Sequence, residues 1–150
     1  MDVMELFHRY RDDVYRLAVS YTRSSQEAED VCQTVFLKLL EQDSIIPGKE
    51  RAWLMQVTVN QCRSLLRSAW WKRTVSLDVT IPAPAPEDWS VRQAIMGLKP
   101  KYRVVVYLHY YEQYTTPEIA KMLKISTSAV TTRLDRARQQ LRRLLKEDEA

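Results

Sequence analysis

The chain contains only two glycine residues, Gly48 and Gly97, among 150. Glycine adopts the positive φ angles of tight turns more easily than any other residue, so a chain with so few has little capacity for a hairpin-rich β fold. Hydrophobic residues make up 45% of the sequence, which is enough to bury a core and argues against a disordered chain. The sequence therefore favours helices.

Apolar residues in the first half of the chain recur every three or four positions, as on the buried face of a helix. This spacing predicts a helix over residues 4–21 with Met4 on its buried side. A second helix is expected from the N-cap Ser24, with Glu27 placed to complete a capping box, to about residue 42. A turn at Pro47 and Gly48 precedes a third helix over residues 50–69. Three such helices form a small bundle.

Three prolines at alternate positions, Pro82, Pro84 and Pro86, end the helical pattern. Proline removes a backbone donor and favours extended chain, so we expect a semi-rigid linker over residues 73–88. The linker separates an N-terminal module, residues 1–72, from a C-terminal module, residues 89–150.

The second half of the chain again shows helical periodicity. We expect helices over residues 89–97 and 100–114, then one that Thr116 caps, and a last one that Ser126 caps and that extends to about residue 146. The predicted fold class is all-α, with two small helical modules joined by a Pro-rich linker.

Charge is distributed unevenly along the chain. The net charge is −4 over residues 1–50, +5 over 51–73, −3 over 74–90 and +6 over 91–150. Two basic blocks separated by acidic ones suggest two surfaces that face a polyanion, although solvated helix faces produce a similar pattern.

The two cysteines, Cys32 and Cys62, fit no metal-binding spacing. We expect buried, reduced thiols, which agrees with a cytoplasmic chain, and we expect no metal or cofactor. The N-terminal residues are too polar for a signal peptide, and no apolar run approaches the ~20 residues that cross a bilayer.

The segment "TPEIAKMLKISTSAVTTRLDRAR", residues 116–138, contains two amphipathic stretches separated by a short break at Lys124. The pattern predicts a helix-turn-helix, whose second helix can enter the major groove of DNA. Its turn requires a left-handed residue, which at Lys124 costs on the order of 1 kcal/mol. An αα-hairpin that only packs is the simpler alternative.

The outer face of the second helix carries hydroxyl, carboxylate and guanidinium groups that suit base edges and phosphates. These candidate DNA-binding residues are Ser128, Thr131, Thr132, Arg133, Asp135 and Arg136. Asp135 can accept a hydrogen bond from a cytosine amino group, and Arg136 can bind a guanine through two hydrogen bonds.

The chain as a whole resembles the small sigma factors of the extracytoplasmic-function (ECF) group. The resemblance to their second region lies in "AEDVCQTVFLKLL" and "RAWLMQVTVNQCRSLLR", and that to their fourth region in "LKPKYRVVVYLHYYEQYTTPEIAKMLKISTSAVTTRLDRARQQLRRLL". It implies a dissociable initiation subunit of RNA polymerase and not an enzyme. In the family, the second region docks on the largest polymerase subunit and captures the minus-ten promoter element. The fourth region reads the minus-thirty-five element and rests on the second-largest subunit.

The resemblance also implies roles for single residues. Asp30 and Gln33 match polymerase-docking positions, and Thr34 stands where the family often has an acid. Asn60 matches a residue that lines the pocket for a flipped minus-ten base, and Ile45 stands near a frequent aromatic of the minus-ten loop, residues 43–50. Basic and aromatic residues suited to single-stranded DNA accompany Asn60, namely Arg63, Arg67, Trp70, Trp71, Lys72 and Arg73.

The partners that the resemblance implies are core RNA polymerase, promoter DNA and an inhibitory anti-sigma factor, which in this family often holds its sigma factor at the membrane. No small-molecule substrate is expected. The rival hypothesis is a stand-alone helix-turn-helix regulator with an N-terminal bundle that dimerises or senses a ligand. An enzyme is disfavoured, because His8 and His109 are far apart in sequence and no glycine-rich phosphate loop or nucleophile motif is present.

Overall fold

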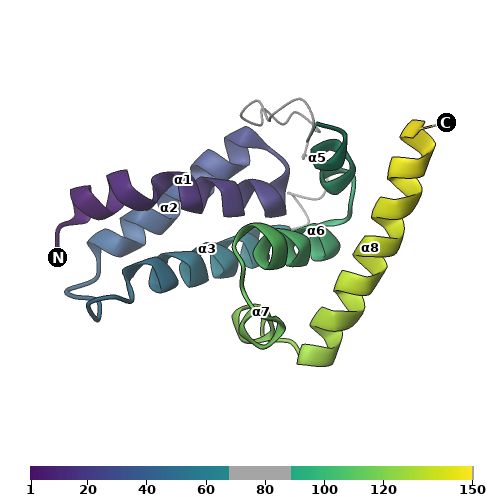
Figure 1. Ribbon diagram of the computed structural model, residues 1–150. Helices are drawn as coiled ribbons and strands as arrows, with labels where there is room; N and C mark the ends of the chain where they lie inside the picture. Colours follow the sequence, from purple (N-terminus) through teal and green to yellow (C-terminus); the bar gives the residue numbers. More distant parts are fainter. Residues whose placement is uncertain (68–88, 150) are drawn as a thin grey trace. The chain divides into compact units, whose positions relative to one another are not determined.

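The computed structural model describes residues 1–67 and 89–149 (Figure 1). The chain divides into two compact units, Met1–Thr80 and Ile81–Ala150. Every element of the described residues is helical, which confirms the all-α prediction. Among these residues, no helix is both long and apolar enough to cross a membrane. The predicted linker, residues 73–88, lies outside the described residues.

The first unit is a bundle of the helices α1 (Val3–Thr22), α2 (Ser25–Leu40) and α3 (Glu50–Leu66), each of which contacts the other two (Figure 1). The core consists of residues that the helical spacing places on one side of each helix, such as Val14, Leu17, Val35, Leu39, Leu54 and Val59. The predicted three-helix bundle is confirmed.

Capping residues determine where these helices begin and end. The Ser24 hydroxyl accepts a hydrogen bond from the Glu27 amide at 3.2 Å, so the predicted N-cap of α2 is confirmed. Helix α1 ends where Arg23 adopts a left-handed conformation with φ 55° and donates to the Val19 carbonyl. Helix α3 ends at Leu66, earlier than residue 69, because Arg67 already serves as its C-cap.

The expectation that Met4 is buried is wrong. Its side chain is 60% exposed, whereas Leu6 is 9% exposed. At the first turn of α1 the side chain of Leu6 lies against the bundle instead. Of the two free cysteines, Cys62 is buried as predicted and Cys32 is half-buried. Burial raises the pKa of Cys32 to about 12 and raises that of Cys62 further, so both thiols remain protonated at neutral pH.

The second unit contains the helices α5 (Trp89–Met96), α6 (Pro100–Val106), α7 (Thr116–Leu123) and α8 (Thr127–Glu149), with a π-helix η2 (Tyr107–Tyr111) that continues α6. Helices α5, α6 and α7 all contact α8. The largest buried side chains include Leu108, Ile119 and Leu134. Arg103 is also buried, at 3% exposure, and its Nη1 donates to the Leu98 carbonyl at 2.8 Å.

Two predicted boundaries in this unit are corrected. The helix expected over residues 100–114 ends with the π-turn at Tyr111, because Gln113 adopts φ 61° and turns the chain away. The N-cap of α7 is Thr115 and not Thr116. The Thr115 hydroxyl accepts a hydrogen bond from the Glu118 amide, so Thr115 is the cap and Thr116 is the first helical residue.

Candidate nucleic-acid interface

Helices α7 and α8 form the predicted helix-turn-helix. Lys124 has φ 58° and ψ 45°, the left-handed conformation that the turn requires, and Ile125 donates to the Ala120 carbonyl at 3.0 Å. Ser126 caps α8 as predicted, since its hydroxyl accepts from the Ala129 amide at 3.1 Å. Val130, Leu134 and Ala137 bury one face of α8 against the rest of the unit. The opposite face is therefore directed to solvent.

The solvent-facing side of α8 brings the sequence-predicted residues together. Ser128, Thr131, Thr132, Asp135 and Arg136 are all exposed, and Arg133 is half-buried. Their spacing of three and four residues places them on neighbouring turns of one helical face. The face is thus a continuous polar strip along the first half of α8.

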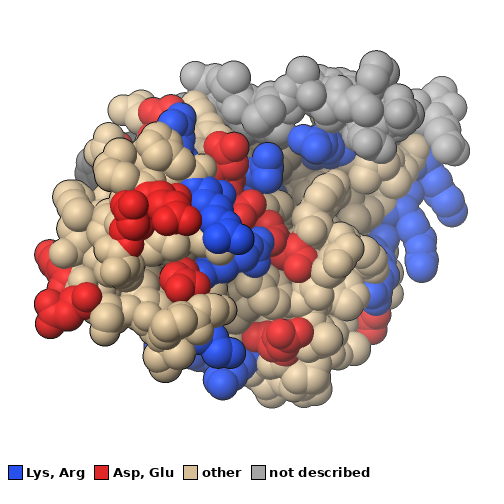
Figure 2. Space-filling view, turned by 60° about the vertical axis from the view of Figure 1, so that its left-hand side comes forward, with Lys and Arg blue, Asp and Glu red and all other residues tan. Residues whose placement is uncertain are grey.

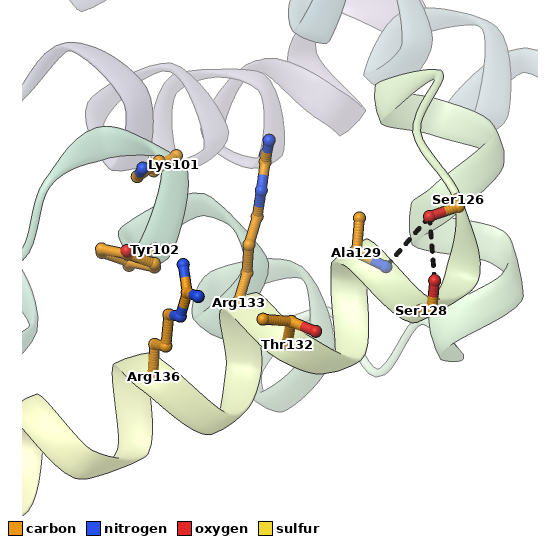
Figure 3. Close-up of a pocket in the computed structure, with 8 residues that line it drawn as sticks. All are labelled: Lys101, Tyr102, Ser126, Ser128, Ala129, Thr132, Arg133 and Arg136. Carbon is orange, nitrogen blue, oxygen red and sulfur yellow. Dashed lines mark hydrogen bonds between the residues drawn. The ribbon is translucent and has the colours of Figure 1, made fainter.

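A cleft of about 320 Å³ lies beside this strip (Figure 3). Three cationic side chains, those of Lys101, Arg133 and Arg136, line it, and its other lining residues are hydroxyl-bearing or small: Tyr102, Ser126, Ser128, Ala129 and Thr132. Among the residues that the structure describes, no acidic side chain lines the cleft. Three cations beside hydroxyl groups form a surface suited to phosphate.

Sequence reasoning missed Lys101 and Tyr102, which reach the cleft from α6. The sequence did contain a signal, because Lys101 lies in the first turn of α6, where a positive charge meets the positive end of the helix dipole. Its Nζ lies 5.1 Å from the centre of the Tyr102 ring. Interaction with the Arg136 side chain is the main cause of a lowered pKa of Tyr102, and the two residues line the same cleft from α8 and α6.

The exposed side of α2 carries the residues predicted to bind polymerase. Asp30 and Gln33 are exposed, whereas Thr34 is half-buried and its hydroxyl donates to the Asp30 carbonyl at 3.1 Å. Sequence reasoning missed Leu37 and Leu40, which are 59% and 63% exposed on the turns that follow Gln33. The sequence did contain a signal for this surface, because Leu37 and Leu40 are apolar residues at positions that fall outside the buried face of α2.

Asn60 is exposed on α3, and its Oδ1 accepts a hydrogen bond from Gln56 Nε2 at 3.0 Å. The amide nitrogen of Asn60 is thus oriented away from Gln56. Arg67 is exposed and Arg63 is half-buried, and Arg67 Nε donates to the Arg63 carbonyl at 3.2 Å. The remaining residues predicted for single-stranded DNA, Trp70, Trp71, Lys72 and Arg73, lie outside the described residues.

The loop before α3 lines a groove of about 600 Å³ together with the first turns of α1. Ile45 is half-buried in this groove, whereas the next residue, Ile46, is 72% exposed. The exposed apolar side chain of this loop is therefore Ile46, one residue after the position that the sequence singled out.

Acidic and basic side chains are interleaved on the face of the molecule that Figure 2 displays. Within the first unit, Asp13 lies 3.4 Å from Arg51 and 3.7 Å from Arg16. Such surface pairs contribute little to stability individually, but each places opposite charges side by side.

Family profiles match both units. The profile described as "Sigma-70 region 2" matches residues 6–72, and that described as "Sigma-70, region 4" matches residues 88–141. The chain is similar to "ECF RNA polymerase sigma factor SigM" of Bacillus subtilis, at 28% identity over 96% of the chain and 95% of that protein. It is also similar to "ECF RNA polymerase sigma factor SigE" of Mycolicibacterium smegmatis, at 30% identity over 92% of the chain, which spans only 59% of that longer protein.

Two solved structures are similar to the chain. The sigma factor RpoE from Bartonella quintana, in complex with the anti-sigma factor NepR, matches 95% of the chain and 96% of its own length, with a TM-score of 0.75 at 19% identity, and therefore shows the fold alone. CnrH, in complex with the cytosolic domain of CnrY, matches 97% of the chain and 88% of its own, with a TM-score of 0.66 at 26% identity.

Proposed function

Because this chain belongs to the sigma-70 family, in its ECF group, we infer that it directs core RNA polymerase to specific promoters and starts DNA melting at transcription initiation. The observation that carries this inference is the presence of both sigma regions, in order, within one chain. A stand-alone helix-turn-helix regulator has no need of a region 2. The role is one of binding, and we propose no catalysis by the chain itself.

We assign polymerase docking to the exposed side of α2. Asp30 and Gln33 supply polar groups, and Leu37 and Leu40 supply apolar area that is costly to leave in water. An interface with a large partner combines such an apolar centre with a polar rim. The coiled coil of the largest polymerase subunit is the partner that the family resemblance implies. The half-buried Thr34 contributes at most at the edge of this surface.

The minus-ten element is assigned to α3 and the loop before it. The Asn60 amide nitrogen can donate to a base acceptor while its oxygen stays bonded to Gln56. Arg63 and Arg67 supply charge for the backbone of the melted strand. We also keep Trp70, Lys72 and Arg73 in this assignment on the basis of sequence.

The minus-thirty-five element is assigned to the polar strip of α8. Thr131, Thr132, Asp135 and Arg136 face the bases in this assignment, and Ser128 and Arg133 face the flanking phosphates. The cleft adds Lys101 to the phosphate-binding residues. This surface would be positioned on DNA by charge and would select sequence through few side chains.

An anti-sigma factor is a partner of this chain's family, as the complexes of RpoE with NepR and of CnrH with CnrY illustrate. A factor that binds core polymerase acts where the polymerase is, so we propose that the protein works in the cytoplasm. Retention at the membrane through an anti-sigma factor is a further proposal, supported by the family resemblance.

The experiment that tests this function compares DNA binding and transcription with and without core polymerase. Purified protein is mixed with genomic promoter fragments in a gel-shift assay, and run-off transcription is measured on the fragments that shift. We expect promoter-specific transcripts with core enzyme and weak binding without it. Tight sequence-specific binding by the free protein, unchanged by core enzyme, would instead identify the stand-alone regulator.

A further inference from the structure

Arg138 connects two residues that lie far apart in the sequence. Its Nε donates to the Tyr110 hydroxyl at 2.7 Å, and its Nη1 lies 3.0 Å from Oδ1 of Asp135. The guanidinium also lies over the Tyr110 ring, 5.6 Å from the ring centre. Because the guanidinium is planar and rigid, its two hydrogen bonds and its contact with the ring together hold it in one orientation. The hydrogen bond to Tyr110 raises the pKa of Arg138.

Tyr110 owes its position to the π-helix η2. A π-turn adds one residue to a helical turn and redirects the side chains that follow, and such turns are frequent at functional sites. Here it leaves Tyr110 50% exposed, with the His109 ring packed edge-on at 4.9 Å. The hydroxyl is then within reach of α8.

The pairing of Arg138 with Asp135 contributes little to stability as an ion pair. The two side chains are 38% and 60% exposed, and exposed pairs of this kind stabilise a fold only weakly. The contacts of Arg138 restrict the Asp135 carboxylate to one orientation, whereas an exposed aspartate without such contacts samples several rotamers. Asp135 lies on the polar strip of α8 between Thr132 and Arg136, among the residues assigned to base recognition.

We propose that Tyr110 is a positioning residue for promoter recognition. Through Arg138 it holds the Asp135 carboxylate in one orientation, and that orientation determines which base pair the strip accepts at one position of the minus-thirty-five element. This proposal rests on the proposed function. Base discrimination by a hydrogen-bonding side chain depends on its direction, so an acceptor held in place rejects a mismatched base more strongly than a mobile one.

The test uses the substitution Tyr110→Phe, which keeps the ring and removes only the hydroxyl. Tyr111→Phe is the matched control, because Tyr111 is also exposed, at 47%, but stacks on Tyr107. In the free ¹⁵N-labelled protein, hydrogen exchange at Arg138 Nε is measured by NMR. Loss of a hydrogen bond of this kind predicts roughly tenfold faster exchange in Tyr110→Phe and no change in the control.

In the second arm, holoenzyme assembled with each variant selects from promoters randomised in the minus-thirty-five element. We expect Tyr110→Phe to reduce base preference at least about threefold at the one position that Asp135→Ala also relaxes, with the other positions and the melting temperature unchanged. In the double variant the loss should equal that of Asp135→Ala alone.

Each outcome decides the proposal. Unchanged exchange at Arg138, unchanged preference in Tyr110→Phe, or a further loss in the Asp135→Ala background would overturn it. If the wild-type holoenzyme selects no promoter at all, the proposed function fails and the positioning role falls with it. An accelerated exchange in Tyr110→Phe would then still establish the Tyr110–Arg138 contact as a structural one.

Discussion

Thr115 and Glu118 exchange hydrogen bonds at the start of helix α7. The Thr115 hydroxyl accepts from the Glu118 amide at 3.3 Å, and the Glu118 carboxylate accepts from the Thr115 amide at 2.9 Å. Two backbone donors that a helix start leaves unpaired are thereby satisfied. Since α7 supports the recognition helix α8, this capping box is part of what places the DNA-binding strip.

The first prediction concerns this cap. Thr115→Ala should lower the free energy of unfolding of the second unit by about 1 kcal/mol, because one amide loses its partner. Thr116→Ala is the matched control and should have little effect, since Thr116 is the first helical residue and not the cap. Chemical denaturation followed by circular dichroism measures both. Equal losses in the two variants would contradict the assignment of the cap.

The second prediction is a dependence of stability on pH. The hydrogen bonds from Thr115 hold the pKa of Glu118 below its ordinary value of 4.5. The folded chain thus binds this proton less readily than the unfolded chain. The resulting stabilisation is present above pH 4.5 and is lost as the pH falls through the lower pKa of the folded state.

The variant Glu118→Gln isolates this contribution. The difference in melting temperature between wild type and Glu118→Gln should be largest near neutral pH and should shrink as the pH is lowered below 4.5. A difference that is constant from neutral to acidic pH would show that the carboxylate charge plays no part in the cap.

The third prediction concerns docking on polymerase. Gln33→Ala and Leu37→Ala should each weaken binding to core enzyme by roughly threefold to tenfold, and should leave the fold intact because both side chains are exposed. Met4→Ala is the control, since Met4 is equally exposed, at 60%, on another helix. Titration of labelled protein with core enzyme measures the affinities. Normal core binding by both variants would place the docking surface elsewhere.

The fourth prediction concerns promoter melting. Asn60→Ala should slow open-complex formation without weakening core binding, because the amide that can bond to an unstacked base is removed. Ser64→Ala, one turn further along α3 and also exposed, serves as the control. Permanganate footprinting of the melted strand follows the reaction. If Asn60→Ala opens the promoter at the wild-type rate, Asn60 does not hold the base.

The fifth prediction separates phosphate binding from base reading in the second unit. Lys101→Ala should weaken holoenzyme binding to all promoter sequences alike. It should also make the slope of log affinity against log salt concentration shallower by about one, which is the contribution of one phosphate contact. Arg136→Ala should weaken binding mainly to the cognate sequence, lower its transcription, and leave core binding intact. Lys99→Ala is the control for Lys101, because Lys99 is exposed but does not line the cleft.

Filter binding at several salt concentrations distinguishes these effects. A sequence-dependent loss in Lys101→Ala would make that lysine a base reader. An equal loss of core affinity and DNA binding in Arg136→Ala would show that Arg136 has no specific role in reading DNA.

Local patterns predicted the helices well where a helix has one clear stripe and a side-chain cap. Ser24 and Ser126 are caps in the structure as they are in the sequence, and Lys124 has the left-handed conformation that the turn demands. The choice between Thr115 and Thr116 was open to the same local reasoning, because only Thr115 has a glutamate three residues later, the spacing of a capping box. The reach of the Glu118 side chain back to the Thr115 amide decides it.

By itself the sequence determined the all-α class and the solvent-facing residues of α8, because these depend on spacings of three or four residues along one helix. It also determined the division into two helical modules, because three prolines interrupt that spacing. Only the tertiary structure decided that Lys101 and Tyr102 share a cleft with Arg136, that Leu37 and Leu40 stay exposed, and that Tyr110 holds Arg138 against Asp135. The physical reason is that these relationships join residues on different helices, or depend on which faces the neighbouring helices leave uncovered. Contacts between helices follow from how their faces pack, and no periodicity within a single helix specifies them.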